Sequence, residues 1–470
     1  MREQYTIDKP LKRRNMKKIV LSVTAAVMIL ATACQDAKKP NTGTLKLTVF
    51  SDSLFKASID SAEIVGAAIL VHQNGKTILK KSYGYASLEL GTPMPSDGVF
   101  DIGSVTKQFT AAAILKLVEA NKLSLDDDFT KYLKFDTKGR KVTINNLLNH
   151  TSGIPSYTEI PEFWDMSKMD YPKDSLVSLV ERNEFMFEPN EALIYNNSAY
   201  FFLGLIIEEV TGQTYEQFLQ QELFEPLGMK NTGYCSITEI VKNKVYGYGY
   251  SPNGLKQAGY QNHIWPYSAG SLCSTTEDLL IWMKALHNGK VLTATMYQSM
   301  ISPDKLKDGS TVSYAKALVN FSNYGHKEIS HGGAITGFSS FIQYYPEDDL
   351  YIITLVNTIG PKKIGRFFGY EITWKLLDKK EYVKIESDFD ANVIQGNYTG
   401  VVRGGDKKTI EIKTIRNGIT RQTVSEEKID TLNVYVGNNT WMDGNDRITI
   451  ANNEYRVDNI YNYYILKKEK

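Results

Sequence analysis

The sequence predicts an α+β protein that ends in a small all-β module. Apolar residues alternate through residues 64–71 and 76–79 on either side of Asn74-Gly75, a pattern typical of a β-hairpin. Through residues 104–120 they recur at helical spacing instead, which predicts a long amphipathic helix with one buried face. After Asp388, short alternating segments separated by polar turns take over, so we expect only strands from there onward.

The N-terminal residues resemble a bacterial lipoprotein signal. Met16-Lys17-Lys18 is basic, Ile19 to Leu30 is apolar but short for a membrane span, and small residues lead directly to Cys34. We expect translation to start at Met16 and residues 1–33 to be an upstream extension and signal peptide. Cys34 would carry the lipid anchor, and residues 34–52 would form a tether. An ordinary cleaved signal peptide is the alternative, and either one predicts that the mature protein works outside the cytoplasm.

The predicted helix opens with a serine and a lysine that can act together. Ser104 and Lys107 are three residues apart and share one helix face, and the serine lies where unpaired N–H groups favour negative charge. A serine hydroxyl needs a neighbour that accepts its proton, and a lysine can do this when burial keeps it neutral. Four further Ser-x-x-Lys pairs lack this context: Ser53/Lys56, Ser302/Lys305, Ser313/Lys316 and Ser425/Lys428.

Two more motifs follow along the chain, Tyr195-Asn196-Asn197 and His331-Gly332-Gly333. Singly, the first would more often be a strand end and the second a structural histidine beside a tight turn. In this order and at wide separations, the three motifs resemble those of the penicillin-recognising serine hydrolases, above all the class C β-lactamase branch with its D-peptidase and esterase relatives. Flanking segments within roughly residues 55–375 resemble that family as well: 144–155, 222–229 and 269–279.

The resemblance implies catalytic roles for Ser104, Lys107 and Tyr195. Ser104 would be the nucleophile, Lys107 its base, and Tyr195 the relay that protonates the leaving group and activates the deacylating water. Asn197 would hold Lys107 and the acyl-side amide of the substrate. The remaining substrate-binding residues implied by the resemblance are His331, Gly332, Gly333 and Ala334.

The resemblance also implies an oxyanion hole made by the backbone N–H groups of Ser104 and Ala334, each typically worth about 3–4 kcal/mol. Glycine at 332 and 333 would let the strand pass close to the substrate. His331 stands where most β-lactamases of this type carry lysine, and a neutral imidazole holds a carboxylate less firmly than an ammonium group. Strong β-lactamase activity is therefore not the first expectation.

By the same resemblance, the fold is a β-lactamase/DD-peptidase-like fold. The hairpins at 64–79 and 338–356 would share one antiparallel sheet, flanked by helices at 104–120 and about 200–221, with the site in the cleft between sheet and helices. The hydrolase domain would cover residues 53–384. Residues 385–470 would form the small all-β domain, whose role the sequence does not indicate.

Other features of the sequence exclude several classes of function. Lys plus Arg number 54 and Asp plus Glu 53, which leaves no basic footprint for nucleic acid. Metal-ligand spacings are absent from the sequence, as is a Gly-x-Ser-x-Gly elbow, so neither a metal, a cofactor nor an α/β-hydrolase fold is expected. His150 is interpreted as structural. Cys235 and Cys273 could pair, but the sequence leaves this open.

Together these features predict a cell-envelope serine hydrolase that acts through an acyl-Ser104 intermediate on D-amino-acid peptides, related amides or small esters. Hydrolysis of the β-lactam ring is the alternative within the same chemistry. A non-catalytic protein that binds penicillin or senses wall fragments is the alternative from another class. The expected partners are a small peptide, ester or β-lactam substrate and, through the lipid, a membrane.

Overall fold

The computed structural model describes residues 42–469, apart from short gaps at 236–237, 361–362, 381, 383–384, 386–388, 404, 417 and 460. The apolar run at 19–30 and Cys34, and with them the predicted signal and lipid anchor, lie outside the described residues. Within the described part of the chain, no helix combines the length and the apolar character needed to cross a membrane.

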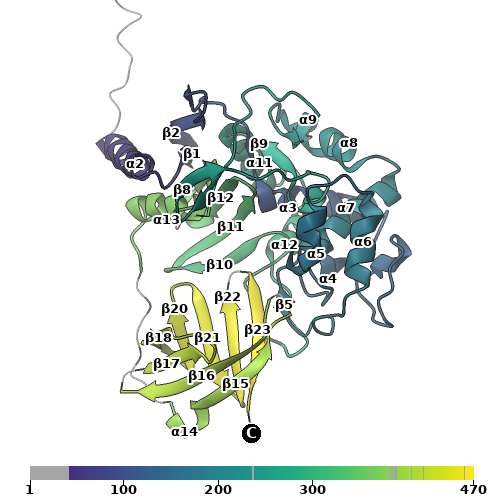
Figure 1. The fold of residues 1–470 in the computed structure, drawn as a ribbon, viewed down its shortest axis with the longest axis vertical. Coiled ribbons are helices and arrows are strands. Elements are labelled where there is room, and N and C mark those ends of the chain that lie inside the picture. The colour runs from purple at the N-terminus through teal and green to yellow at the C-terminus, as the bar shows by residue number, and fades with distance from the viewer. Residues whose placement is uncertain are drawn as a thin grey trace, which may run out of the picture. The chain divides into compact units, whose positions relative to one another are not determined.

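A seven-stranded antiparallel sheet forms the centre of the fold, in the order β10-β11-β12-β13-β1-β2-β3 (Figure 1). Its strands are β1 (Gly66–Gln73), β2 (Lys76–Ser87), β3 (Thr92–Pro93), β10 (Val319–Asn323), β11 (His326–Ile335), β12 (Phe338–Tyr345) and β13 (Leu350–Val356). Both predicted hairpins are confirmed, since β1 pairs with β2 and β12 with β13. β1 also pairs with β13, which joins the two hairpins into one sheet.

Both faces of this sheet are covered by helices, and alternation along β1 shows how. Ala67, Ile69 and Val71 belong to one apolar cluster, whereas Ala68 and Leu70 point the other way into a second, larger cluster. The first cluster includes residues of α13 (Gly365–Leu376) and of α2 (Thr42–Asp60). The second cluster is the shared core of the sheet and the helical region.

The helical region is built around α3, whose side chains are mostly buried. Its helices are α3 (Thr106–Glu119), α4 (Ile144–Leu148), α5 (Pro161–Met166), α6 (Lys173–Glu181), α7 (Asn197–Thr211), α8 (Tyr215–Leu219), α9 (Glu225–Leu227), α10 (Tyr267–Gly270), α11 (Thr276–His287) and α12 (Ala294–Ile301). The predicted helix at 104–120 is confirmed. The one predicted over about 200–221 is two helices, because Gly212 at φ +69° ends α7 and Thr214 caps α8.

Two short sheets complete this part of the fold. One contains β4 (Phe100–Asp101), β9 (Leu272–Ser274) and β6 (Gly233–Tyr234), and the other β14 (Thr358–Ile359), β7 (Tyr248–Ser251) and β8 (Gly254–Gln257). At the first of them, Cys235 and Cys273 form a disulfide, with their Cα atoms 5.5 Å apart. The structure thus decides the pairing that the sequence left open.

The C-terminal module is a curved, barrel-like antiparallel sheet with its own apolar core around Tyr398, Trp441 and Tyr455 (Figure 1). After the short helix α14 (Ala391–Ile394), its strands are β15 (Gly396–Val401), β16 (Lys407–Ile415), β17 (Gly418–Thr423), β18 (Ile429–Leu432), β19 (Val434–Gly437), β20 (Thr440–Asp443), β21 (Asp446–Ala451), β22 (Glu454–Asn459) and β23 (Asn462–Lys468). β23 also pairs with β5 (Leu193–Ile194), which leads directly into Tyr195.

The predicted tether over residues 34–52 is wrong in its C-terminal part, because α2 begins at Thr42. Leu47 and Phe55 of this helix are buried in the apolar cluster on the sheet. The segment is rich in Thr and Ser, which are only moderate helix formers, so burial of a few apolar side chains rather than propensity stabilises it. The predicted domain boundary at 384/385 falls among the gaps between described residues.

Candidate active site

Ser104 stands in a tight turn, Gly103–Val105, immediately before α3. Gly103 has φ +50°, and a Cβ on it would lie 2.8 Å from the nitrogen of Ala334, closer than real side chains come. Only glycine therefore allows this turn to approach β11 so closely. The turn brings Ser104 beside Ala334, its predicted partner in the oxyanion hole.

Lys107 faces Ser104 from the first turn of α3. Its Nζ lies 3.1 Å from Ser104 Oγ, 2.8 Å from Asn197 Oδ1 and 2.7 Å from the carbonyl oxygen of Ala269. Burial, assisted by the positive charge of Arg403, holds the pKa of Lys107 well below its ordinary value. A neutral amine can donate two hydrogen bonds, which the side-chain oxygen of Asn197 and the carbonyl oxygen of Ala269 can accept. Its lone pair is then free to accept the proton of the Ser104 hydroxyl.

The second motif lies at the N-terminus of α7. Asn196 caps the helix, and its side-chain oxygen accepts a hydrogen bond from the Ala199 N–H at 2.9 Å. Asn197 is the first residue of α7, and its Nδ2 donates to Thr158 Oγ1 at 3.1 Å. This bond fixes the amide so that its oxygen faces Lys107.

Tyr195 lies on the other side of Lys107, whose Nζ is 4.9 Å from the centre of the tyrosine ring. Burial raises the pKa of Tyr195 above its ordinary value, opposed by the nearby Ser104 hydroxyl and the charge of Arg403. Its own hydroxyl has no hydrogen-bond partner of good geometry among the described residues. Tyr195 is thus a protonated phenol at neutral pH.

β11 presents an open edge to Ser104. β10 pairs only with residues 326–330, so residues 331–335 have a neighbouring strand, β12, on one side alone. A Cβ on Gly333 would lie 2.0 Å from the carbonyl oxygen of Ile102, so glycine lets the strand lie against the backbone that leads into Ser104. The Gly332 N–H points away from β12, and the N–H two residues on, at Ala334, points the same way.

His331 does not line the cleft, contrary to the prediction that it binds substrate. Its side chain is 0% exposed, with Nδ1 at 2.7 Å from the Gly332 carbonyl oxygen and Nε2 at 3.0 Å from the Tyr314 hydroxyl. The carbonyl can only accept, so Nδ1 carries the proton and Tyr314 donates to Nε2. Burial and the nearby Lys107 lower the pKa of His331 to about 3, so it is neutral and supports the strand from behind.

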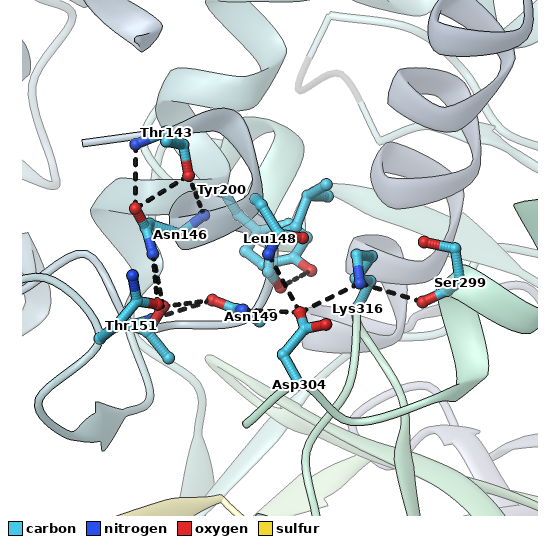
Figure 2. A network of polar contacts seen from close by, with 11 residues as sticks. Thr143, Asn146, Leu148, Asn149, Thr151, Tyr200, Ser299, Asp304 and Lys316 are labelled. Atoms are coloured by element: carbon cyan, nitrogen blue, oxygen red, sulfur yellow. Dashed lines mark hydrogen bonds and ion pairs between the residues drawn. The ribbon is translucent and has the colours of Figure 1, made fainter. Parts of the chain in front are cut away.

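His150 also lies behind the site, as expected for a structural residue. Its Nδ1 accepts a hydrogen bond from the Asn196 N–H at 3.2 Å, and its ring packs 4.5 Å from that of Tyr195. Burial keeps its pKa well below the ordinary value. A polar network holds the preceding and following residues: Asn149 Nδ2 donates to Asp304, and Thr151 donates to Asn149 Oδ1 (Figure 2).

The same network excludes the strongest rival to Ser104/Lys107. Lys316 is buried, but its Nζ donates to Asp304 Oδ2 at 3.2 Å and to the Ser299 carbonyl at 3.0 Å (Figure 2). Ser313 points elsewhere, with its Oγ 3.4 Å from Asp458 Oδ2. The Ser313/Lys316 pair therefore forms no nucleophile–base contact.

Two cavities meet at Ser104. One, of about 260 Å³, is mainly apolar and is lined by Tyr157, Phe163, Trp164, Pro266 and Ile359 among others. The other, of about 350 Å³, contains Tyr195 and the backbone of residues 332–334, and its further lining residues include Arg366, Arg403 and Tyr461. A bound substrate could thus extend from Ser104 in two chemically different directions.

Several of these residues were not identified from the sequence. Ala269 opens a segment that resembles the family, so its position was flagged without its role as acceptor for Lys107. Arg366, Arg403 and Tyr461 belong to no recognisable motif. Arg403 and Tyr461 come from the C-terminal module and reach the site only through tertiary contacts.

In the described part of the chain, one group of side chains has metal-like spacing: Asp101, Cys235 and Cys273. The disulfide engages both sulfur atoms, so these residues do not form a metal site in this state.

The chain matches the Beta-lactamase family over residues 51–367. Protein flp from Staphylococcus aureus (strain MRSA252) is 28% identical over 315 residues, which cover 65% of this chain and 62% of that protein, so the match spans less than two thirds of this relative. The octameric penicillin-binding protein homologue from Pyrococcus abyssi superposes with a TM-score of 0.62 at 23% identity, covering 89% of this chain and 99% of that one. The D-amino acid amidase from Ochrobactrum anthropi superposes with a TM-score of 0.60 at 24% sequence identity, and the match covers 70% of this chain and 96% of the amidase.

These findings identify the chain as a member of the β-lactamase family, with the β-lactamase/penicillin-binding-protein fold that its three motifs predicted. The structural likenesses lie below 25% identity and therefore bear on the fold alone.

Proposed function

We propose that this protein is a serine hydrolase that acts through an acyl-Ser104 intermediate on D-amino-acid peptides, related amides or small esters. The observation that carries the proposal is the contact of 3.1 Å between Ser104 Oγ and the Nζ of Lys107, a buried lysine whose pKa burial holds well below its ordinary value. A structural lysine in such surroundings would be paired with a carboxylate, as Lys316 is with Asp304.

The proposed reaction begins with proton transfer from the Ser104 hydroxyl to the lone pair of Lys107. The serine oxygen bonds to the acyl carbon, and the resulting oxyanion accepts hydrogen bonds from the backbone N–H groups of Ser104 and Ala334. The bond to the leaving group then breaks, and Tyr195 delivers the proton that the leaving atom needs and is reprotonated from Lys107. Water attacks the acyl-enzyme, its proton passes through the same two residues, and Ser104 is released.

The choice of acyl donor rests on two supports. The cleft beside an open strand edge suits a peptide-like donor, which can lie along residues 333–335. Among proteins of the same fold is an amidase whose substrates are D-amino acid amides, according to its name. Hydrolysis of β-lactams stays the alternative within this chemistry, and a non-catalytic wall-sensing role the alternative outside it.

The test uses soluble protein from Gln35 onward, mixed with a penicillin and separately with a p-nitrophenyl ester, and follows intact mass over time. We expect an adduct on the wild type and on Ser313→Ala, the matched control, and none on Ser104→Ala. A short-lived adduct indicates a hydrolase and a lasting one a binding protein. An adduct on Ser104→Ala, or none on the wild type with no ester turnover, overturns the proposal.

We also propose that the protein is a lipoprotein of the bacterial cell envelope, anchored through Cys34. The support is the basic, apolar and small-residue pattern that ends at this cysteine. Expression of the full chain in a bacterium should place it in the detergent phase, and Cys34→Ala should move it to the aqueous phase. An unchanged distribution would rule out the lipid anchor.

A further inference from the structure

The C-terminal β module supplies two side chains to the cavity that contains Tyr195. Arg403 lies in the connection between β15 and β16, and Tyr461 directly precedes β23. Strand pairing holds Tyr461 in place, since the next two residues, Asn462 and Tyr463, pair with Ile194 and Leu193. The module thus forms part of the wall of this cavity.

Tyr461 occupies the open edge of β11. Its hydroxyl accepts the Gly332 N–H at 3.1 Å, and its ring lies 5.5 Å from that of Tyr195. An extended peptide that added to this edge would need the same N–H. Because Tyr461 already satisfies it, a chain bound along residues 333–335 cannot continue as a strand past Gly332.

Two guanidinium groups line the same cavity. Arg366, at the start of α13, lies with its Cζ 5.1 Å from the centre of the Tyr461 ring. The buried carboxyl of Glu328 attracts it electrostatically, but among the described residues no carboxylate is close enough to form an ion pair with it. Arg403 Nε donates to Glu159 Oε1 at 3.0 Å, which orients the guanidinium and leaves its terminal N–H groups without a hydrogen bond to any described residue. Glu159 does not itself line the cavity, and neither does any other acidic residue that the structure describes.

The side of the site that holds the leaving group follows from Tyr195. This residue protonates the leaving atom in the reaction proposed above, and it lines only the cavity with the arginines. The apolar cavity on the other side of Ser104 has no arginine or lysine among its lining residues. The acyl part therefore faces apolar and aromatic side chains, and the leaving group faces positive charge.

We propose that Arg403 and Tyr461 of the C-terminal module, together with Arg366, form a closed subsite that selects acyl donors whose leaving group is small and carries a carboxylate. This inference rests on the proposed function. Two fixed guanidinium groups favour a planar carboxylate because each can donate more than one hydrogen bond to it. Tyr461 limits the length of the leaving group, because it blocks the strand edge beyond Gly332.

The test compares two thioesters with the same N-acyl-D-alanyl group, one releasing thioglycolate and the other its neutral methyl ester. The measured quantity is the ratio of kcat/KM for the anionic and the neutral donor. We expect the ratio to exceed one for the wild type and to fall about tenfold in Arg403→Gln, the usual effect of one charge-assisted hydrogen bond. A ratio is used because Arg403 also acts on Lys107, which affects both donors equally.

Arg416→Gln is the matched control, because Arg416 is an exposed arginine of the same module and lines neither cavity. The inference is overturned if the ratio of kcat/KM for the two donors is unchanged in Arg403→Gln, or if it falls equally in Arg416→Gln. In either case both thioesters are still hydrolysed, so the proposed function stands. If neither thioester acylates the wild-type protein, the proposed function fails instead.

Tyr461→Ala tests the length limit with a third thioester, whose leaving group is one residue longer. We expect the wild type to hydrolyse it about tenfold more slowly than the thioglycolate donor, and Tyr461→Ala to reduce this difference. Tyr461→Phe keeps the ring and should preserve most of the discrimination by size. Equal rates on both donors in the wild type would show that Tyr461 does not close the subsite.

Discussion

Lys107 and Tyr195 sit within 5 Å of each other, yet burial moves their pKa values in opposite directions. Burial disfavours the charged form of each group, so it lowers the pKa of the lysine and raises that of the tyrosine. In the proposed reaction this difference suits Lys107 to act as the base and Tyr195 as the acid. His150 and His331 are kept neutral by the same burial, so they add no charge that would repel a proton from Lys107.

For the individual residues, we expect kcat/KM to fall as pH is lowered and Lys107 becomes protonated. The midpoint of this acid limb of the pH profile should lie well below the ordinary lysine pKa. Arg403 contributes to that low pKa, so Arg403→Gln should raise it and move the acid limb to higher pH. On that limb kcat/KM for a neutral donor should be about two- to fivefold below wild type, since Arg403 is partly exposed and screened. A limb that stays in place or moves to lower pH would contradict this role.

At the scale of elements, the site depends on how closely β11 passes the turn before α3. Gly103 and Gly333 allow this from both sides, because a Cβ on either would collide with backbone atoms of the other segment. The contact sets the position of Ser104 against the Ala334 N–H. Sub-ångström placement matters in such sites, since a displacement of about 1 Å can cost about a hundredfold in rate.

Gly333→Ala should therefore lower kcat/KM by about a hundredfold or more, because its Cβ would lie 2.0 Å from the Ile102 carbonyl oxygen. Gly332→Ala is the matched change one residue earlier, where the nearest atom is the Tyr461 hydroxyl at 3.0 Å, the end of a side chain that can shift. We expect it to cost less than about tenfold. Both variants are compared by steady-state kinetics and by thermal unfolding. Equal losses of kcat/KM in the two variants would argue against the close approach of β11 to the turn before α3 as the cause.

At the scale of the whole molecule, the C-terminal module and the hydrolase fold share a sheet through β5 and β23. Around this pairing lies an apolar cluster with residues from both parts, including Leu193, Tyr195, Tyr314 and Tyr463. Tyr195 is thus held partly by the module, and its N–H donates to Asn462 Oδ1 at 3.3 Å. The module is a structural part of the site as well as a wall of its cavity.

We therefore expect thermal unfolding of the protein from Gln35 onward to be a single transition by calorimetry, with activity lost in the same interval. Separation of the two parts would expose the shared apolar cluster and break the β5–β23 pairing, which disfavours a state with only one part folded. Two resolved transitions, with activity surviving the first, would show that the module folds and acts independently.

In the same region, the carboxyl of Asp458 on β22 should make the stability of the protein depend on pH. Its Oδ1 is buried without a hydrogen-bond partner, and burial raises the pKa of its carboxyl to about 7. The folded state then binds more protons than the unfolded state between about pH 4 and 7, so stability falls as pH rises through this window.

Asp458→Asn removes this titration and keeps the shape of the side chain. At about pH 8 we expect the variant to be more stable than wild type by about 1–2 kcal/mol, and at about pH 4 to show little difference. Thermal melts at both pH values measure it. An equal change at both would mean that the effect comes from packing rather than from the charge.

The sequence predicted the fold class and the two hairpins, because alternation and turn residues are local signals that burial reinforces. It also predicted Ser104, Lys107, Tyr195 and Asn197, which lie in motifs that a resemblance can carry, and the structure brings these four side chains together. α2 was missed because its Thr- and Ser-rich sequence is a weak helix signal, and the length of the second helix was wrong because the Gly212 cap was overlooked.

The tertiary structure alone decided the direction in which each motif side chain points and which distant residues join it. His331 turns into the core, although its motif suggested contact with substrate, since side chains on a strand alternate between faces and only the packing shows which face is buried. Arg403 and Tyr461 reach the site from about 300 residues or more beyond Ser104 along the chain, through strand pairing that no local pattern encodes. The motif residues of the candidate site were therefore recognisable in the sequence, whereas the walls of its cavities depend on how two separately cored parts pack together.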